Sequence, residues 1–192
     1  MSVTTETPRA RPPRKNVIRL SVLGALALAA VIIVSVLTGG SVAGTPCEAS
    51  NALVGHRVAA FAAPGLSAGT VHAPWSQHHA GVVIFFASWC GPCQREMPEV
   101  AAYIASHSLT PIQVVGVDAL DARGAAQHFV THDAVTFPVA FDPNGNVTSG
   151  EFKFQTVPET AFVDATGVVR FVYYGAIPTS CLVSDVAALK AT

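Results

Sequence analysis

An uncharged apolar segment near the N-terminus constrains this chain more than any other feature. No Asp, Glu, Lys or Arg occurs between residues 20 and 47, and residues 20–38 read LSVLGALALAAVIIVSVLT. As an α-helix this run would be about 28 Å long, close to the ~30 Å thickness of the hydrocarbon core of a bilayer. We therefore predict a transmembrane anchor over residues 17–38 and a separate folded domain after it.

The charges that precede the apolar segment predict its orientation. The first 19 residues contain five Lys or Arg residues and a single acid, Glu6. Basic residues next to a membrane span remain on the cytoplasmic side. Residues 1–16 are therefore expected to form a cytoplasmic tail, and the folded domain is expected on the extracytoplasmic side of a bacterial cell membrane.

Two alternatives to a retained anchor stay open. Ser41-Val42-Ala43 offers a small-x-small site for a signal peptidase, which would release a secreted domain, although the apolar region of a secretory signal is usually roughly 7–15 residues. Cys47 follows the segment as it would in a lipoprotein, but the large aliphatic residue expected three positions earlier is missing and Pro46 stands where a small residue is expected. All three interpretations place the domain outside the cytoplasm.

Charge and composition exclude several classes of protein. The chain has a formal net charge of −1 and only 12% charged residues. Without its basic tail the remainder is acidic, which disfavours polyanion binding. The chain has neither a Gly-rich phosphate loop nor a basic aromatic stripe, so we expect no nucleotide or nucleic-acid partner and no cofactor. His72, His78 and His79 could suggest a metal site, but we interpret them as solvated polar surface and expect no metal. Residues 39–55, rich in small and turn-forming residues, are interpreted as a stalk, and residues 56–192 as one domain.

Hydrophobic patterning predicts alternating strands and helices in this domain. Residues 81–87 form a continuous apolar run, typical of a strand buried on both faces. Further strands are expected at 58–61, 69–72, 112–117, 137–141, 160–164 and 168–174, and helices at 90–107, 121–132 and 184–190. The first two short strands would form an N-terminal hairpin. The order predicts an α/β fold whose sheet is parallel at its centre and antiparallel at one edge.

Two cysteines stand where the buried strand is expected to become a helix. Cys90 and Cys93 flank Gly91-Pro92. Free N–H groups and the helix dipole favour negative charge at a helix N-terminus, which lowers the pKa of the first thiol. Cys93 lies one turn further, within reach of a small-ring disulfide. The pattern predicts a dithiol that exchanges with other disulfides.

Two other uses of these cysteines are disfavoured. A zinc site would need a second Cys or His pair at ligand spacing, which is missing from the sequence. A Cys–His hydrolase is the second alternative, but none of the seven histidines carries an associated signature.

The residues around the dithiol resemble a known family. Residues 89–98 read WCGPCQREMP, residues 157–160 read VPET, residues 162–167 read FVDATG, and Gly175 follows the last strand. Together these motifs resemble the TlpA/ResA/CcmG group of membrane-tethered thiol–disulfide oxidoreductases, over roughly residues 56–192. The resemblance implies a thioredoxin-like fold, a central mixed sheet flanked by helices, with a TlpA-type insertion at about residues 119–142.

The resemblance also implies roles for residues beside the dithiol. Pro158 would be a cis-proline that leaves the backbone of Val157 free to pair with a substrate peptide, and Trp89 would be a partly exposed contact. Glu96 would exchange a proton with the second cysteine if burial raises its pKa. At Ile84, by contrast, cytoplasmic thioredoxins carry a buried Asp. The alternatives are a trans proline, a core tryptophan and a solvated Glu96.

Cys47 and Cys181 remain outside the exchange motif. Outside the cytoplasm two unassigned thiols tend to pair. A bond between them would close a loop that includes most of the domain, and long loops give the largest entropic stabilisation. We therefore predict a structural disulfide between Cys47 and Cys181.

These observations predict an enzyme that acts on partner-protein disulfides through Cys90 and Cys93. Gly91-Pro92 between the thiols resembles the reducing members of the group. This resemblance implies a reductase, with cytochrome c maturation as its candidate pathway and a membrane thiol transporter of the CcdA/DsbD type as its electron source. The first alternative is an oxidase or isomerase in the folding of secreted proteins. A thiol peroxidase, which usually has a Thr/Pro-x-x-Cys nucleophile and an Arg partner, and an inert docking domain are less favoured.

Overall fold

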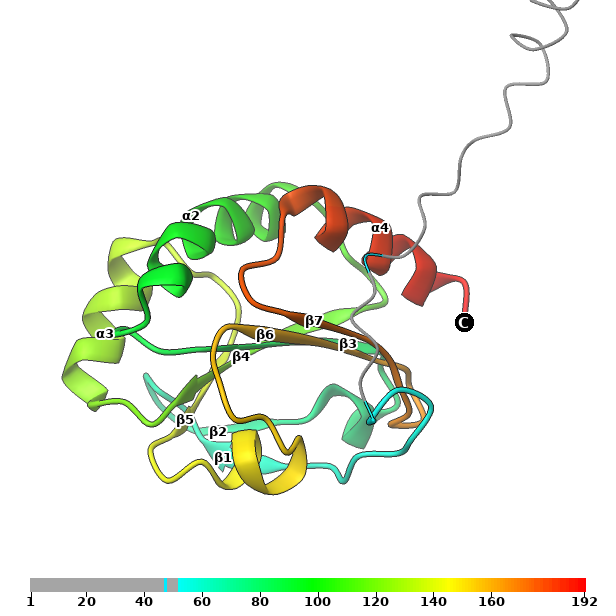
Figure 1. The fold of residues 1–192 in the computed structure, drawn as a ribbon, viewed down its shortest axis with the longest axis horizontal. Coiled ribbons are helices and arrows are strands. Elements are labelled where there is room, and N and C mark those ends of the chain that lie inside the picture. Colours follow the sequence, from blue (N-terminus) through cyan, green and yellow to red (C-terminus); the bar gives the residue numbers. More distant parts are fainter. Residues whose placement is uncertain (1–46, 48–51) are drawn as a thin grey trace, which may run out of the picture. The chain divides into compact units, whose positions relative to one another are not determined.

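Five strands form the central sheet (Figure 1). The computed structural model describes residue 47 and residues 52–192. The strands are β3 (Gly81–Phe86), β4 (Gln113–Ala119), β5 (Val139–Asp142), β6 (Glu159–Val163) and β7 (Val169–Tyr174), in the spatial order β5-β4-β3-β6-β7. β3, β4 and β5 are parallel, whereas β6 and β7 are each antiparallel to the preceding strand in that order. The expected mixed sheet is therefore confirmed.

The central position of β3 follows from its sequence. All six of its residues are buried, because β4 and β6 cover its two edges and helices and loops cover both faces. Complete burial of a phenylalanine stabilises a fold by roughly 1.5–3 kcal/mol, and Phe85 and Phe86 are both fully buried, on opposite faces. This strand anchors the loop that carries the dithiol.

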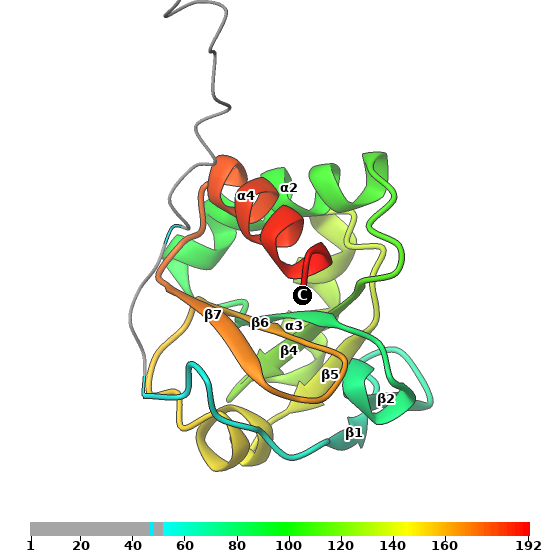
Figure 2. The same cartoon turned by 90° about the vertical axis from the view of Figure 1, so that its right-hand side faces the viewer.

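Three helices cover one face of the sheet (Figures 1 and 2). They are α2 (Gly91–Ser106), α3 (Arg123–His132) and α4 (Thr179–Lys190). The core beneath them is formed by side chains from β3 and from all three helices, including Val82, Ile84, Phe86, Met97, Phe129 and Leu182. The flanking helices of a thioredoxin-like fold are thus present.

Short elements cover the opposite face. The antiparallel hairpin of β1 (Ala62–Pro64) and β2 (Thr70–His72) is joined there by two short helical turns, η1 (Pro74–Gln77) and η2 (Asn146–Glu151). The core on this side is rich in aromatic residues, including Phe61, Trp75, Phe85, Phe152 and Phe154. The expected N-terminal hairpin is present, whereas neither helical turn was predicted.

The first strand of that hairpin begins later than expected. The sequence favours residues 58–61, but β1 spans Ala62–Pro64. Val58 and Phe61 are buried in the core, and the Val58 N–H bonds to the carbonyl of Gly167 outside the hairpin. The apolar pattern therefore predicted correctly which residues are buried, but the strand pairing begins only after them.

Two helices also begin at positions that differ from the prediction. α3 begins at Arg123 instead of residue 121, because Ala122 keeps extended backbone angles as the N-cap residue while its N–H donates to Oδ1 of Asp121. α4 begins at Thr179, five residues before the predicted start, directly after Pro178. Pro178 is the N-cap residue of α4, and its carbonyl accepts the backbone N–H groups of Cys181 and Leu182.

The predicted tail (1–16), anchor (17–38) and most of the stalk (39–55) lie outside the described residues. Among the residues that are described, no helix has both the length and the apolar character needed to cross a bilayer. The boundaries of tail, anchor, stalk and domain therefore stay predictions.

Candidate active site

The dithiol lies where β3 passes into α2. Cys90 is the N-cap residue of α2, with extended backbone angles, and its Sγ accepts a hydrogen bond from the backbone N–H of Cys93 at 3.1 Å. Pro92 occupies the first turn of the helix, where a missing N–H costs nothing. The local sequence thus aims a helix N-terminus at the first sulfur.

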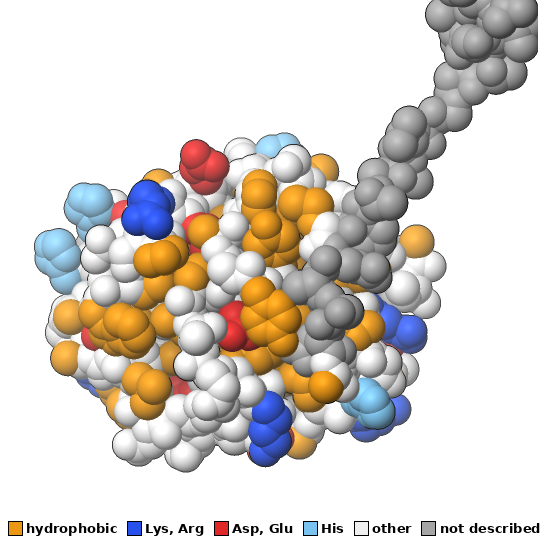
Figure 3. Space-filling model, in the orientation of Figure 1, with side chains coloured by type: hydrophobic (Ala, Val, Ile, Leu, Met, Phe, Trp, Pro, Cys, Tyr) orange, Lys and Arg blue, Asp and Glu red, His pale blue; other side chains and the backbone are white. Residues whose placement is uncertain are grey.

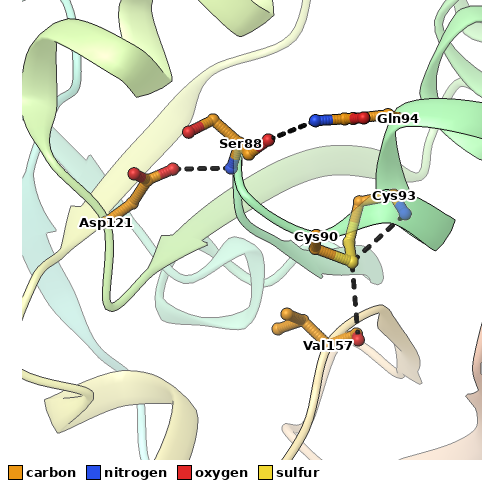
Figure 4. The surroundings of a disulfide bond; sticks show 6 residues. All are labelled: Ser88, Cys90, Cys93, Gln94, Asp121 and Val157. Carbon is orange, nitrogen blue, oxygen red and sulfur yellow. Dashed lines mark hydrogen bonds between the residues drawn. A yellow bond between two sulfur atoms is a disulfide. The ribbon is translucent and has the colours of Figure 1, made fainter.

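Cys90 and Cys93 form a disulfide in this structure (Figure 4). Both residues are almost completely buried, and the Cys90 Sγ lies 3.5 Å from the carbonyl oxygen of Val157. The peptide bond between Val157 and Pro158 is cis. The segment before β6 therefore places a backbone carbonyl directly beside the first sulfur.

Glu96 lies one turn beyond Cys93 on α2. Its side chain is buried, and neither carboxyl oxygen has a hydrogen-bond partner of ordinary geometry in the described part of the chain. Desolvation by burial raises the pKa of Glu96 from 4.5 to about 7, and the backbone of Ile177 offsets only part of this rise. The carboxyl group can therefore take up or release a proton near neutral pH.

Trp89 and Ile84 lie in contrasting environments. The Trp89 side chain is 60% exposed, and its Nε1–H donates to the carbonyl oxygen of Leu120 at 3.1 Å. Ile84, in the middle of β3, is fully buried in the apolar core beneath the helices. The tryptophan is a surface group beside the dithiol, and the buried acid of this site comes from α2 instead of β3.

Two residues that the sequence reasoning missed hold the loop before Cys90. The Asp121 Oδ2 accepts the backbone N–H of Ser88 at 2.6 Å, and the Gln94 side chain donates to the Ser88 carbonyl at 2.7 Å (Figure 4). Asp121 follows the end of β4. The carboxyl ends of neighbouring parallel strands share one edge of a sheet, and that rule could have identified Asp121 from the sequence.

Asp118, the sixth residue of β4, is a second buried acid near this edge. It pairs in register with Phe86, is fully buried, and has no hydrogen-bond partner of ordinary geometry among the described residues. Desolvation raises the pKa of Asp118 to about 8, and the carboxylates of Asp121 and Asp142 add to this rise. Its signal in the sequence is a lone acid within an otherwise buried strand.

The second disulfide joins Cys47 to Cys181. Cys181 lies in the first turn of α4 and is buried, whereas Cys47 is half-buried and its backbone N–H contacts Asp185 Oδ1 at 3.4 Å. This bond ties the segment before the domain to the C-terminal helix. The Val157 carbonyl contacts Cys90 and not this second pair.

The structure therefore gathers most of the residues singled out from the sequence. Cys90, Cys93, Trp89 and Glu96 come from the end of β3 and the start of α2, and Val157 reaches the first sulfur from the segment before β6. A sulfur that accepts a helical N–H, a buried second sulfur and a carboxyl that titrates near neutral pH can together perform thiol–disulfide exchange.

A dithiol at the start of a helix, facing a proline loop on a mixed sheet, defines a redox protein of the thioredoxin fold. Residues 54–172, well over half of the chain, match the AhpC/TSA family, and the chain belongs to that family. The resemblance to thiol–disulfide oxidoreductases given above from the WCGPC and VPET motifs is likewise confirmed by the named relatives described next, whereas the membrane tether stays a prediction.

Relatives with solved structures cover the folded domain. MTB dsbF is 35% identical, with a TM-score of 0.60, over 67% of this chain and 94% of its own. A putative thiol:disulfide interchange protein DsbE from Chlorobium tepidum is 30% identical, also with a TM-score of 0.60, over 71% of this chain and 97% of its own.

Curated relatives are similar over a shorter region. The thiol–disulfide oxidoreductase ResA of Oceanobacillus iheyensis is 31% identical over 98 residues, which is 50% of this chain and 50% of that protein. The chain thus spans about half the length of the curated relatives it matches.

Proposed function

We propose that this protein is an extracytoplasmic thiol–disulfide oxidoreductase that reduces disulfides of partner proteins. The observation that carries the proposal is the position of Cys90. Its sulfur accepts the Cys93 N–H at a helix N-terminus and lies 3.5 Å from the carbonyl of Val157. A partner peptide that paired with the Val157 backbone would bring its own sulfur next to Cys90.

The first step starts from the reduced protein. The thiolate of Cys90 attacks one sulfur of the partner's disulfide, a new S–S bond forms between them, and the partner's other sulfur leaves as a thiolate. The N–H of Cys93 stabilises the Cys90 thiolate before the attack. The product is a mixed disulfide between Cys90 and the partner.

The second step releases the partner. Cys93 gives its proton to the carboxylate of Glu96, and the Cys93 thiolate attacks the sulfur of Cys90. The bond to the partner breaks, the partner's second thiolate leaves, and Cys90–Cys93 becomes the disulfide seen here. Two electrons have passed to the partner. Glu96 suits this role because its pKa of about 7 lets it accept a proton at neutral pH.

Reduction is the favoured direction for two reasons. Gly91-Pro92 between the thiols resembles the reducing members of the group. In addition, a Glu96 carboxylate disfavours a nearby thiolate, which stabilises the disulfide form of this protein and makes its dithiol the better electron donor. We propose a role in cytochrome c maturation and recharging by a membrane thiol transporter of the CcdA/DsbD type.

Oxidation of partner thiols is the second candidate. The hydrogen bond from the Cys93 N–H to Sγ of Cys90 stabilises the thiolate, and stabilising the reduced form makes a dithiol more oxidising. We place either reaction outside the cytoplasm, with the chain anchored through residues 17–38 or released by cleavage after residue 43.

Insulin reduction by the full-length protein tests the proposed activity. With a thiol reductant present, the wild type should precipitate the insulin B chain well above the background rate, and Cys90→Ser should not. Equal rates for the two proteins would contradict the proposal. Consumption of peroxide at a comparable rate would instead favour a thiol peroxidase.

A further inference from the structure

Apolar side chains are exposed at several places on the surface (Figure 3), and two large ones, Trp89 and Leu120, lie next to the dithiol. Trp89 is 60% exposed and Leu120 is 56% exposed, the highest values among the large apolar residues of the described chain. Trp89 follows β3, and Leu120 directly follows β4. Because these neighbouring strands are parallel, both residues emerge at the edge of the sheet where Cys90 lies.

The backbone of Leu120 is held in an unfavourable conformation. Its φ angle is +54°, in the left-handed region that favours glycine and that a bulky side chain rarely adopts. Because the Leu120 side chain is largely exposed, its burial offsets little of this strain. Its Cδ2 methyl group lies beside the turn at Gly145. A strained residue with an exposed side chain points to a role other than core packing.

Hydrogen bonds hold this part of the surface in place. The Leu120 carbonyl accepts the Trp89 Nε1–H at 3.1 Å, and the Leu120 N–H donates to the Asp142 carbonyl at 3.0 Å. The next residue, Asp121, accepts the Ser88 N–H at 2.6 Å. The two loops are thus fixed to each other before a partner arrives, which lowers the entropic cost of binding.

We propose that Trp89 and Leu120 form one apolar surface that binds an apolar side chain next to the reacting cysteine of the partner polypeptide. This inference rests on the proposed function, because attack by Cys90 requires the partner's chain to lie along this edge beside Val157. The Leu120 side chain offers neither a hydrogen-bond donor nor an acceptor. Its contribution to recognition is therefore apolar contact.

Two disulfide-linked peptide dimers test this proposal when they differ only in the residue beside the cysteine, Leu or Ser. The pre-reduced full-length protein is mixed with each, and the second-order rate constants are compared as a ratio within each variant. We expect the wild type to favour the Leu peptide about 10-fold and Leu120→Gly to lower that ratio to about 2 or less. Leu120→Asn should lower the ratio similarly, and Leu120→Met, which keeps an apolar side chain of similar size, should retain the wild-type preference.

Val54→Ser is the matched control, since Val54 is also exposed but precedes Gly55, which bonds to β7 at the opposite end of the sheet. Its ratio should equal that of the wild type. Glycine and asparagine both tolerate a positive φ, so the Leu120 variants are expected to fold. A wild-type ratio near 1, or an unchanged ratio in Leu120→Gly, would overturn the proposal. So would self-association that is lost in Leu120→Gly while the peptide ratio stays unchanged.

A binding measurement separates this proposal from the proposed function. If the wild type exchanges neither peptide nor hydroxyethyl disulfide, the proposed function fails. The apolar surface can then still be tested by binding. The oxidised protein is titrated with the same peptides after their cysteine has been replaced by serine, and the two affinities are compared. A preference for the Leu peptide that disappears in Leu120→Gly supports the apolar surface, and equal affinities contradict it.

Discussion

Each of the two disulfides lies at the start of a helix, yet their surroundings differ. Cys90 caps α2, and the backbone N–H of Cys93 donates to its sulfur. Cys181 lies in the first turn of α4, but its backbone N–H donates to the carbonyl of Pro178. The first pair spans three positions of the chain, and the second pair, with Cys47, spans 134.

If only the first pair exchanges, as we propose, then a helix N-terminus alone is not enough to make a disulfide reactive. The Cys90 sulfur accepts a hydrogen bond and lies 3.5 Å from the carbonyl oxygen of Val157, and the buried carboxyl of Glu96 lies one turn beyond Cys93. Short separation and these contacts favour exchange at the first pair. Long separation favours stabilisation of the fold by the second pair.

The largest expected effect is the loss of exchange when the first pair is broken. Cys90→Ser should reduce insulin turnover by about 10³-fold or more, because an alcohol replaces the nucleophilic thiolate. The matched control is Cys47→Ser/Cys181→Ser, which should keep the wild-type rate within about two-fold. A comparable loss in the control would contradict the division of roles.

Removal of the second pair should instead affect stability. We expect Cys47→Ala/Cys181→Ala to lower the free energy of unfolding by about 2–5 kcal/mol in urea titrations, because the unfolded chain loses its largest constraint. Reduction of Cys90–Cys93 opens only a short loop, so it should lower the free energy of unfolding by less. The opposite ranking of the two pairs would refute the comparison.

The stability contribution of Glu96 should depend on pH. In the unfolded chain this carboxyl ionises near pH 4.5, and in the folded chain near pH 7. Folding therefore takes up a proton between these values, and wild-type stability should fall as pH rises through this window and then level off. Glu96→Gln cannot ionise, so it should be more stable than the wild type by up to about 3 kcal/mol at pH 8 and equally stable at pH 4.

Asp118 titrates in the same direction, but it is present in both proteins, so the difference between their urea midpoints isolates Glu96. Equal stability of the two proteins at pH 8 would show that Glu96 ionises normally in the folded state.

The smallest expected effect is kinetic. Glu96→Gln should prolong the mixed disulfide with a partner by about 10-fold at pH 7, because Cys93 loses its proton acceptor. Acid quenching followed by thiol alkylation and gel electrophoresis measures this lifetime. If Glu96 only fills space, the isosteric glutamine will leave the lifetime unchanged.

Much of the fold was predictable because apolar runs mark buried strands. Residues 81–87 identified β3, and the strand–helix alternation gave the mixed sheet. The apolar signal failed where burial and strand pairing separate, as at Val58 and Phe61, which are buried before β1 begins. It also missed η2, whose polar sequence gives no periodic pattern.

The candidate site was predictable where its residues are local in sequence. Cys90, Cys93 and Glu96 share one helix, so spacing alone relates them. Asp121 and Leu120 were missed because their importance depends on hydrogen bonds to Ser88 and Trp89, more than 30 positions away. The rule that neighbouring parallel strands share one edge of a sheet would have brought these residues together, but only once the order of the strands had been inferred.

The reduction potentials of both pairs test the central claim most directly. The full-length protein is equilibrated in defined thiol–disulfide buffers, and each pair is followed by alkylation and mass mapping. The account predicts a value near that of thioredoxin, about −270 mV, for Cys90–Cys93, while Cys47–Cys181 remains oxidised to below about −300 mV. A value near that of DsbA, about −120 mV, for Cys90–Cys93 would contradict the reductase, and reduction of both pairs together would contradict their separate roles.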